Sequence, residues 1–276
     1  MREISKSLNH GYNVNLTDVQ IWKYVCDVFE NKYNDIFKEY WDEIIANRLI
    51  NEIILKYYPG ERIVKYHLIK KFIGRKKEVT LFEMYADNSS RVDLCRVNGK
   101  SIAYEIKSDL DNLDRLNKQI EDYSKIFEFT YVTTTKAQLS KVLDIIPDFC
   151  GVQLYRLEGE KCFFSYPKKA EKSPNIKPSS QVNSLSSKDI EFILKELAFK
   201  KIPSTRSERE EALLSSFGEK TINKMFKKAI QNKYKNQWRF IKDNFNSILP
   251  IDMQSFFHQN ISPQLIYYKS SSKVNI

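Results

Sequence analysis

Apolar side chains recur with helical spacing along the first part of the chain. Between residues 17 and 57 they fall three or four positions apart, as they do on one face of a helix. This spacing predicts two helices, or one helix broken near Asn34. A further helix is predicted over residues 61–73, and residues 1–16 are predicted to be loose.

The spacing then changes to a period of two, which indicates β-strands. Three consecutive strands are predicted over residues 79–85, 91–97 and 100–107. Beyond them helical and strand spacing alternate. The later elements are predicted to be helices over 112–127, 136–146, 188–200, 206–217 and 219–245, a strand over 129–134 and a hairpin around Glu158-Gly159.

This order of elements predicts an α/β (α+β) protein with a mixed β-sheet flanked by helices. Residues 167–187 are rich in Pro, Ser and Lys, a composition that is typical of a linker. The predicted organisation is an N-terminal helical segment (1–58), a core that contains the sheet (59–166), the linker, and a basic helical module (188–276).

Three acidic residues interrupt the alternating strands, and the register predicts that they face one another. If the apolar even positions share a buried face, residue 97 must pair with 101 across a three-residue loop with a left-handed Gly99. Asp93 then lies opposite Glu105. The five-residue loop before it pairs 85 with 91 and places Glu83 opposite Asp93.

Like charges placed directly opposite each other destabilise a sheet, so a row of three carboxylates needs a cationic partner. Oxygen ligands grouped in this way suit a hard divalent ion, magnesium or manganese. Lys107 lies two residues after Glu105 and is expected on the same face. An acidic pair, a lysine and a metal ion match the needs of phosphodiester hydrolysis.

The run from Asp93 to Glu105-Ile106-Lys107 resembles the PD-(D/E)xK nuclease superfamily. Gln119 and Tyr123 follow on the next predicted helix and resemble the QxxxY motif of its RecB-like branch. The whole stretch is similar to a group of small bacterial proteins of that superfamily. The resemblance is best over about 60–135 and does not cover the first 50 residues; Val92 stands where proline is common.

The resemblance implies a restriction-endonuclease-like core and a metal-dependent deoxyribonuclease, with repair, mobile-element biology and phage defence as typical settings. It implies that Asp93, Glu105 and the Ile106 carbonyl bind Mg²⁺ or Mn²⁺ and that Lys107 contacts the phosphate or the attacking water. Gln119 and Tyr123 would orient these groups, with Glu83 as an additional acid. Arg115, one turn before Gln119, either holds a phosphate or pairs with a neighbouring aspartate.

The charge distribution supports a nucleic-acid partner. The net charge is +10, and residues 1–166 contain 25 Lys+Arg and 25 Asp+Glu, so the whole excess lies in the remaining residues. A basic module favours a polyanion. On the predicted helix over 219–245 the candidate phosphate contacts are Lys224, Lys228 and Lys235, with a solvated basic face as the other interpretation. The sequence does not distinguish DNA from RNA.

Composition excludes several other classes of protein. Hydrophobic content is 42% and charged content 29%, as in a soluble globular chain. No apolar run approaches the roughly 20 residues of a membrane span, and no secretory signal is apparent. The four cysteines lack metal or disulfide spacing, which favours a cytoplasmic location. There is no P-loop motif for ATP.

Two other functions remain compatible with the sequence. A nuclease-like fold without turnover would serve as a nucleic-acid-binding or assembly protein. The aromatic N-terminal helices would alternatively bind a partner protein or form a homodimer, although such a stripe is more often core.

Overall fold

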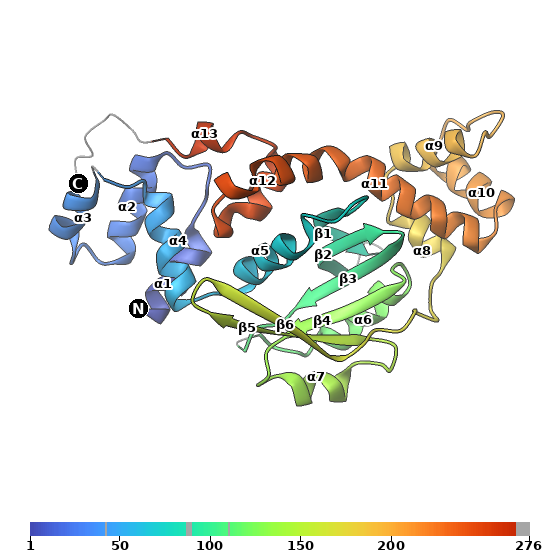
Figure 1. Cartoon of the computed structure of the whole chain (residues 1–276). Helices are drawn as coiled ribbons and strands as arrows, with labels where there is room; N and C mark the ends of the chain where they lie inside the picture. The colour runs from blue at the N-terminus through green and yellow to red at the C-terminus, as the bar shows by residue number, and fades with distance from the viewer. Residues whose placement is uncertain (42, 87–89, 110, 269–276) are drawn as a thin grey trace. The chain divides into compact units, whose positions relative to one another are not determined.

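A mixed β-sheet forms the centre of the described structure, as the sequence predicted. The computed structural model describes residues 1–41, 43–86, 90–109 and 111–268. Within these ranges one six-stranded sheet has the order β1-β2-β3-β4-β5-β6 (Figure 1). The β1–β2 and β2–β3 pairs are antiparallel, and the β3–β4 and β4–β5 pairs are parallel. The strands are β1 (Val79–Ala86), β2 (Ser90–Asn98), β3 (Lys100–Ile106), β4 (Phe129–Thr134), β5 (Gly151–Glu158) and β6 (Lys161–Lys168).

The predicted register of the first three strands is confirmed. Tyr85 pairs with Arg91, and Val97 pairs with Ser101. Gly99 has a φ of 71°, so the turn between β2 and β3 uses the left-handed conformation that glycine adopts without steric cost. This register fixes which residues share a face of the sheet, and with it the position of the acidic residues.

Both faces of the central strands are covered. On one face the ring of Phe72 packs 5.7 Å from that of Tyr104. On the other face α6 (Leu116–Ser124) covers the sheet, and its Tyr123 reaches Glu105 of β3. Val92 and Cys95, which belong to opposite faces of β2, are both fully buried. A polar side chain on these strands therefore needs a protein partner rather than water.

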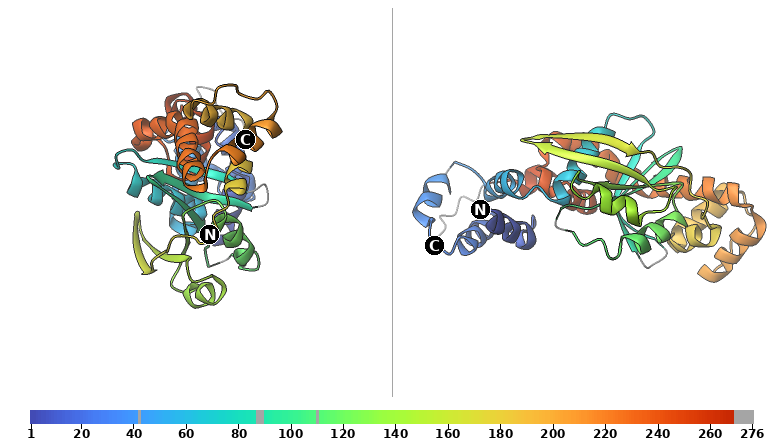
Figure 2. Two further views of the ribbon diagram at one scale, coloured as in Figure 1. Left: turned by 90° about the vertical axis from the view of Figure 1, so that its right-hand side faces the viewer. Right: turned by 90° about the horizontal axis from the view of Figure 1, so that it is seen from below.

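The described residues form two compact units. One contains residues 71–156 and 163–238, and with them most of the sheet and the predicted site. Its helices are α6, α7 (Leu139–Ile145), α8 (Pro178–Asn183), α9 (Ser187–Glu196), α10 (Arg206–Ser216) and most of α11 (Glu219–Asn244). In Figures 1 and 2, α8, α9, α10 and the first part of α11 form a group beyond one end of the strands.

The segment predicted as a linker, 167–187, is instead hydrogen-bonded to the sheet unit. The Ser173 amide donates to the Glu128 carbonyl at 2.8 Å, and the Lys177 amide donates to the Lys125 carbonyl at 2.9 Å. The segment then forms α8. Its polar composition is typical of a linker. Serine and lysine nevertheless have the same main-chain hydrogen-bond donors as other residues, so the segment can pack by its backbone.

The other compact unit contains residues 1–70, 157–162 and 239–276, and its described part consists mainly of helices, together with the adjoining ends of β5 and β6. Residues 1–16, predicted to be loose, include helix α1, whose Leu8 is fully buried. The region 17–57 holds three helices rather than two, with left-handed backbone at Glu30 and Asn31 between the first pair. The elements are α1 (Arg2–Gly11), α2 (Asp18–Val28), α3 (Asn34–Trp41), α4 (Ala46–Tyr57), most of α5 (Glu61–Phe72), η1 (Phe245–Ser247), η2 (Pro250–Asp252), α12 (Met253–Gln259) and α13 (Pro263–Ile266).

Aromatic side chains of the N-terminal helices divide between core and surface. Trp22 packs against Trp41 with ring centroids 5.8 Å apart, and Phe37 is buried beside them. Tyr33 and Tyr40 remain 47% exposed. The core interpretation therefore holds for much of the stripe, and the homodimer stays a prediction.

A buried carboxyl joins distant parts of this helical unit. Asp252 is 1% exposed, and its Oδ2 accepts hydrogen bonds from the hydroxyls of Tyr267 at 2.6 Å and Tyr12 at 3.1 Å. Burial raises the pKa of Asp252 to about 7, against the opposing hydrogen bonds and the positive charge of Arg62.

In the described part of the chain, no helix is long and apolar enough to cross a membrane.

We expect Gly151→Ala to destabilise the sheet unit. A Cβ at this position would lie 2.5 Å from the Ala170 amide nitrogen and 2.5 Å from the Tyr131 ring, and a backbone amide cannot move aside cheaply. Overpacking of this kind costs about 1–3 kcal/mol. Urea denaturation measures the change, with Gly74→Ala as the control because no atom lies near the added Cβ there. Equal stability of the two variants would contradict the packing of residues 167–187 described above.

We expect the contribution of Asp252 to the stability of the chain to fall as the pH rises from about 4 to about 7. The folded-state pKa of Asp252 is raised from 3.8 to about 7, so the folded state binds this proton more tightly than the unfolded state does. The stabilisation is complete below the unfolded-state pKa and is lost as pH rises through the folded-state pKa, by on the order of 4 kcal/mol. Asp252→Asn should remove this component in denaturation measured at several pH values, whereas the exposed Asp144→Asn should not.

Candidate active site

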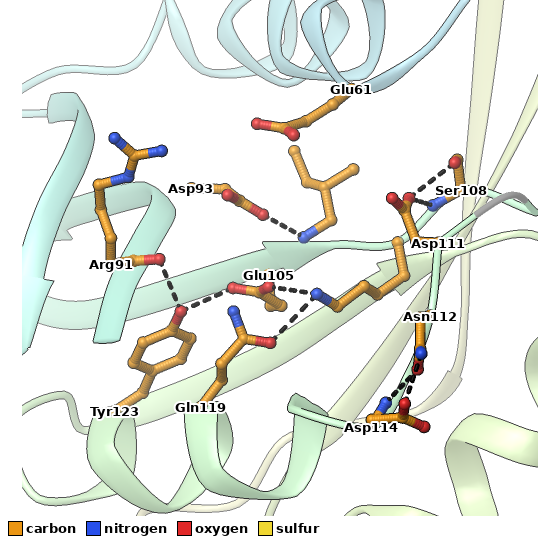
Figure 3. Close-up of polar contacts among 12 residues, drawn as sticks. Glu61, Arg91, Asp93, Glu105, Ser108, Asp111, Asn112, Asp114, Gln119 and Tyr123 are labelled. Atoms are coloured by element: carbon orange, nitrogen blue, oxygen red, sulfur yellow. Dashed lines mark hydrogen bonds and ion pairs between the residues drawn. The ribbon is translucent and has the colours of Figure 1, made fainter. Parts of the chain in front are cut away.

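Asp93 lies where the ladder between β2 and β3 gives way to a side-chain contact. The pairing of these strands runs from Asn98–Lys100 to Leu94–Tyr104. At the next position the Asp93 carboxylate accepts a hydrogen bond from the Ile106 amide at 2.7 Å. A side chain thus replaces a main-chain acceptor, which holds Asp93 beside the end of β3 (Figure 3).

Glu105 is 2% exposed, and both of its carboxylate oxygens have partners. Oε1 lies 2.8 Å from the Lys107 ammonium, and Oε2 accepts a hydrogen bond from the Tyr123 hydroxyl at 2.7 Å. Figure 3 shows these contacts converging from β3 and α6. Because a buried charge without partners is strongly unfavourable, these two donors are what make Glu105 tolerable at this position.

Lys107 is held on three sides just after β3. Its ammonium also donates to Gln119 Oε1 at 3.1 Å, and its amide donates to the Thr133 carbonyl at 2.9 Å. The Lys107 side chain is only 13% exposed. Gln119 and Tyr123 are four residues apart on α6, so both reach the same site from one helix face, as the sequence predicted.

Tyr123 connects Glu105 to the neighbouring strand. Its hydroxyl lies 2.8 Å from the Arg91 carbonyl as well as 2.7 Å from Glu105 Oε2, so one hydrogen is shared between two acceptors. Burial raises the pKa of Tyr123, and the charge of Glu105 raises it further, while a hydrogen bond with Gln119 opposes both. The phenol therefore stays protonated and acts as a donor.

The register around Glu83 is as predicted, but its side chain does not complete a metal-binding group. The backbone of Glu83 is left-handed, with a φ of 54°, and its carboxylate lies 3.4 Å from the Arg91 guanidinium. Within the described ranges, no three or more His, Cys, Asp or Glu residues are grouped so as to hold a metal ion. The prediction of a row of three acids assumed regular strand geometry, which the left-handed residue breaks.

The predicted nucleic-acid contacts lie on two elements, with Arg115 just before α6 and the three lysines on α11. Arg115 is exposed at the N-terminal end of α6. On α11, Lys228 forms an ion pair with Glu196, and the ammonium of Lys235 donates to the side chain of Asn232 at 3.0 Å. The remaining candidate, Lys224, is exposed.

Two contributions to the site were not predicted from the sequence. Arg91 acts through its main-chain carbonyl, a group that every residue has, so residue type gives no signal. The Asp111 carboxylate accepts hydrogen bonds from the Ser108 amide and hydroxyl, both at 2.6 Å, and so fixes the chain that follows Lys107. An aspartate three residues after a serine is a readable turn signal.

The family described as bacteriophage P4 protein cII matches residues 56–256, more than two thirds of the chain. The chain belongs to the bacteriophage P4 protein cII family. The matched range includes the whole Asp93–Glu105–Lys107 cluster and the two α6 residues that contact it. No curated protein matches this member of the P4 cII family.

A solved structure, a protein of unknown function from Silicibacter pomeroyi, is similar to part of this P4 cII-family protein. The similarity covers 58% of this chain and 96% of the other, at 14% sequence identity and a TM-score of 0.34.

We expect Tyr123→Phe to destabilise this P4 cII-family protein by about 1–3 kcal/mol, because a buried Glu105 oxygen and the Arg91 carbonyl both lose their donor. Chemical denaturation measures the change. Tyr131→Phe is the matched control in the same unit, since no hydrogen bond of its hydroxyl occurs among the described residues. If both variants lost the same stability, the Tyr123 hydroxyl would not have the structural role described.

Proposed function

We propose that the chain is a magnesium-dependent nuclease that hydrolyses phosphodiester bonds in DNA. The observation that carries this proposal is the contact of the Lys107 ammonium with Glu105 at 2.8 Å, beside an Asp93 carboxylate bound to the intervening Ile106 amide. Two carboxylates and a lysine are thereby gathered at the adjoining ends of two strands. The resemblance of the same residues to PD-(D/E)xK nucleases supports this interpretation.

The donor set fits a magnesium ion in part. Asp93, Glu105 and the Ile106 carbonyl would hold the metal, and all three supply the oxygen donors that Mg²⁺ prefers. Proteins commonly bind this ion through one or two carboxylates together with water and substrate phosphate, so a third acid is not required. Because the ammonium of Lys107 occupies Glu105 Oε1, that oxygen becomes available only when Lys107 moves.

A bound magnesium ion would supply Lewis-acid activation of the phosphate and of a water molecule. The chain's own residues would orient the reacting groups and stabilise the charge on the phosphate. Lys107 carries a positive charge that can contact a phosphate oxygen, and charge stabilisation of this type acts strongly where water is excluded. Gln119 holds that ammonium in place, and Tyr123 fixes the direction of Glu105.

DNA contact beyond the site is proposed to come from exposed basic side chains. Lys224 and Lys235 of α11 are exposed, and so is Arg115, which immediately precedes α6. Lys228 forms an ion pair with Glu196, so its charge is partly compensated within the protein. Contacts of this kind bind phosphate without reading sequence. We also propose a cytoplasmic location, which the free state of all four cysteines supports.

One observation favours the alternative function, a nucleic-acid-binding or assembly protein without turnover. Both oxygens of Glu105 are bound by protein donors, and the described residues hold no larger acidic group around them. In that case the Lys107–Glu105 pair would be a structural ion pair. Metal binding distinguishes the two functions, because only the nuclease needs it.

We expect cleavage of DNA that requires magnesium or manganese, is abolished by EDTA, and falls about 100-fold or more in Asp93→Asn and Lys107→Ala. The assay uses labelled plasmid, linear, single-stranded and branched DNA. Manganese binding followed by electron paramagnetic resonance adds a readout that is independent of turnover. Asp93→Asn should lose the bound metal, whereas Lys107→Ala should keep it, since it only removes a competing cation.

The matched controls are the exposed pair Asp27→Asn and Lys23→Ala of α2, which change the same residue types in the other compact unit. Wild type that binds DNA but neither binds manganese nor cleaves any substrate would overturn the nuclease proposal in favour of the binding role.

A further inference from the structure

A polar cavity of about 540 Å³ lies in the same compact unit as the proposed nuclease site. It is bounded by β1, by the segment joining α8 to α9, and by residues of α10 and α11. Cavities of this size accept small ligands or single nucleotides. The lining used in the argument below consists of Glu83, Tyr85, Asn183, Arg206, Lys233 and Tyr234.

A short chain of contacts connects the cavity to the site. Glu83 lines the cavity and lies 3.4 Å from the Arg91 guanidinium. The carbonyl of the same Arg91 accepts the Tyr123 hydroxyl, which also binds Glu105. Tyr85 pairs directly with Arg91 across the strands. A ligand in the cavity would therefore lie on the β1 side of the Glu105–Lys107 cluster.

The charges that line the cavity are matched internally, which argues against a simple phosphate site. Arg206 donates to Glu210 at 2.6 Å and to the Asn183 carbonyl at 3.2 Å. Lys233 forms an ion pair with Asp189 at 3.1 Å. What remains is a set of fixed donors and acceptors rather than a net positive charge.

Two tyrosines complete the lining. Tyr85 is 58% exposed and lies next to the end of the edge strand β1. Tyr234 is half-buried, with the Lys233 ammonium 5.4 Å from its ring centroid. Flat aromatic faces beside fixed hydrogen-bonding groups suit a ligand that is itself a flat heteroaromatic ring with polar edges. A nucleobase has this chemistry.

We propose that this cavity binds one unpaired nucleobase of the DNA strand being cut, with the Tyr85 ring as the stacking platform. The proposal rests on the proposed nuclease function and specifies its substrate, a DNA with a single-stranded stretch next to the scissile phosphate. A base within a duplex is paired and stacked on both sides, so it cannot enter without first leaving the helix.

The test measures binding by the full-length chain in EDTA, where no cleavage occurs. Short single-stranded and double-stranded DNAs of the same sequence carry fluorescein for anisotropy, and a second set carries 2-aminopurine, whose fluorescence falls on stacking. Tyr85→Ala should weaken single-strand binding about 10-fold and abolish the 2-aminopurine quenching, with duplex binding unchanged. Tyr85→Phe keeps the ring and should behave as wild type. Tyr40→Ala, which removes another exposed tyrosine (47%) in the helical unit, should also behave as wild type.

The outcomes separate the two proposals. The base pocket is overturned if Tyr85→Ala binds single strands as wild type does. It is also overturned if Tyr85→Ala weakens single-strand and duplex binding equally. Neither result affects the proposal of metal-dependent cleavage. If the protein quenches 2-aminopurine in a Tyr85-dependent way but never cleaves DNA, the base pocket is supported and the nuclease proposal is overturned. Absence of single-strand binding by wild type overturns the base pocket, while the nuclease proposal is decided by cleavage with magnesium.

Discussion

Burial of the Glu105 carboxylate is the constraint on which the rest of the site depends. At 2% exposure it has lost almost all hydration, and only directed donors can compensate for that loss. The two donors come from different places, Lys107 from the strand's own continuation and Tyr123 from α6. Strand register, helix position and lysine orientation are therefore coupled through one acidic side chain.

Under the proposed nuclease function, the same coupling would keep the site ordered and still available for chemistry. Lys107 is held by two oxygens on opposite elements, so its ammonium would have little freedom before a substrate bound. A group held in this way loses less entropy when it contacts a phosphate than a surface lysine does. A metal ion bound at this site would compete with Lys107 for Glu105 Oε1.

Much of this arrangement could be predicted from the sequence, because the alternation of side chains along a strand and the length of a connecting loop are both local properties of the sequence. Alternation fixed the faces, and the loop lengths fixed the pairing, so the positions of Asp93, Glu105 and Lys107 on one face follow from the sequence pattern. Gln119 and Tyr123 were indicated by their resemblance to the QxxxY motif, and helical spacing placed both on one face. Glu83 could not be placed, because its left-handed backbone depends on surroundings that the pattern does not contain. The contribution of the Arg91 carbonyl could not be predicted, because every residue has this group. The packing of residues 167–187 could not be predicted either, because main-chain hydrogen bonds do not depend on the polar composition of the segment.

Every side chain of the cluster comes from one continuous stretch, residues 83–123, which includes three neighbouring strands and the helix that follows them. The contacts of Gln119 and Tyr123 with the strands close loops of 12 to 32 residues, and the entropy lost in closing a loop grows only slowly with its length. The one addition from outside this stretch is the Thr133 carbonyl of β4, which accepts the Lys107 amide. Assembly of the described site therefore does not depend on bringing the two ends of the chain together.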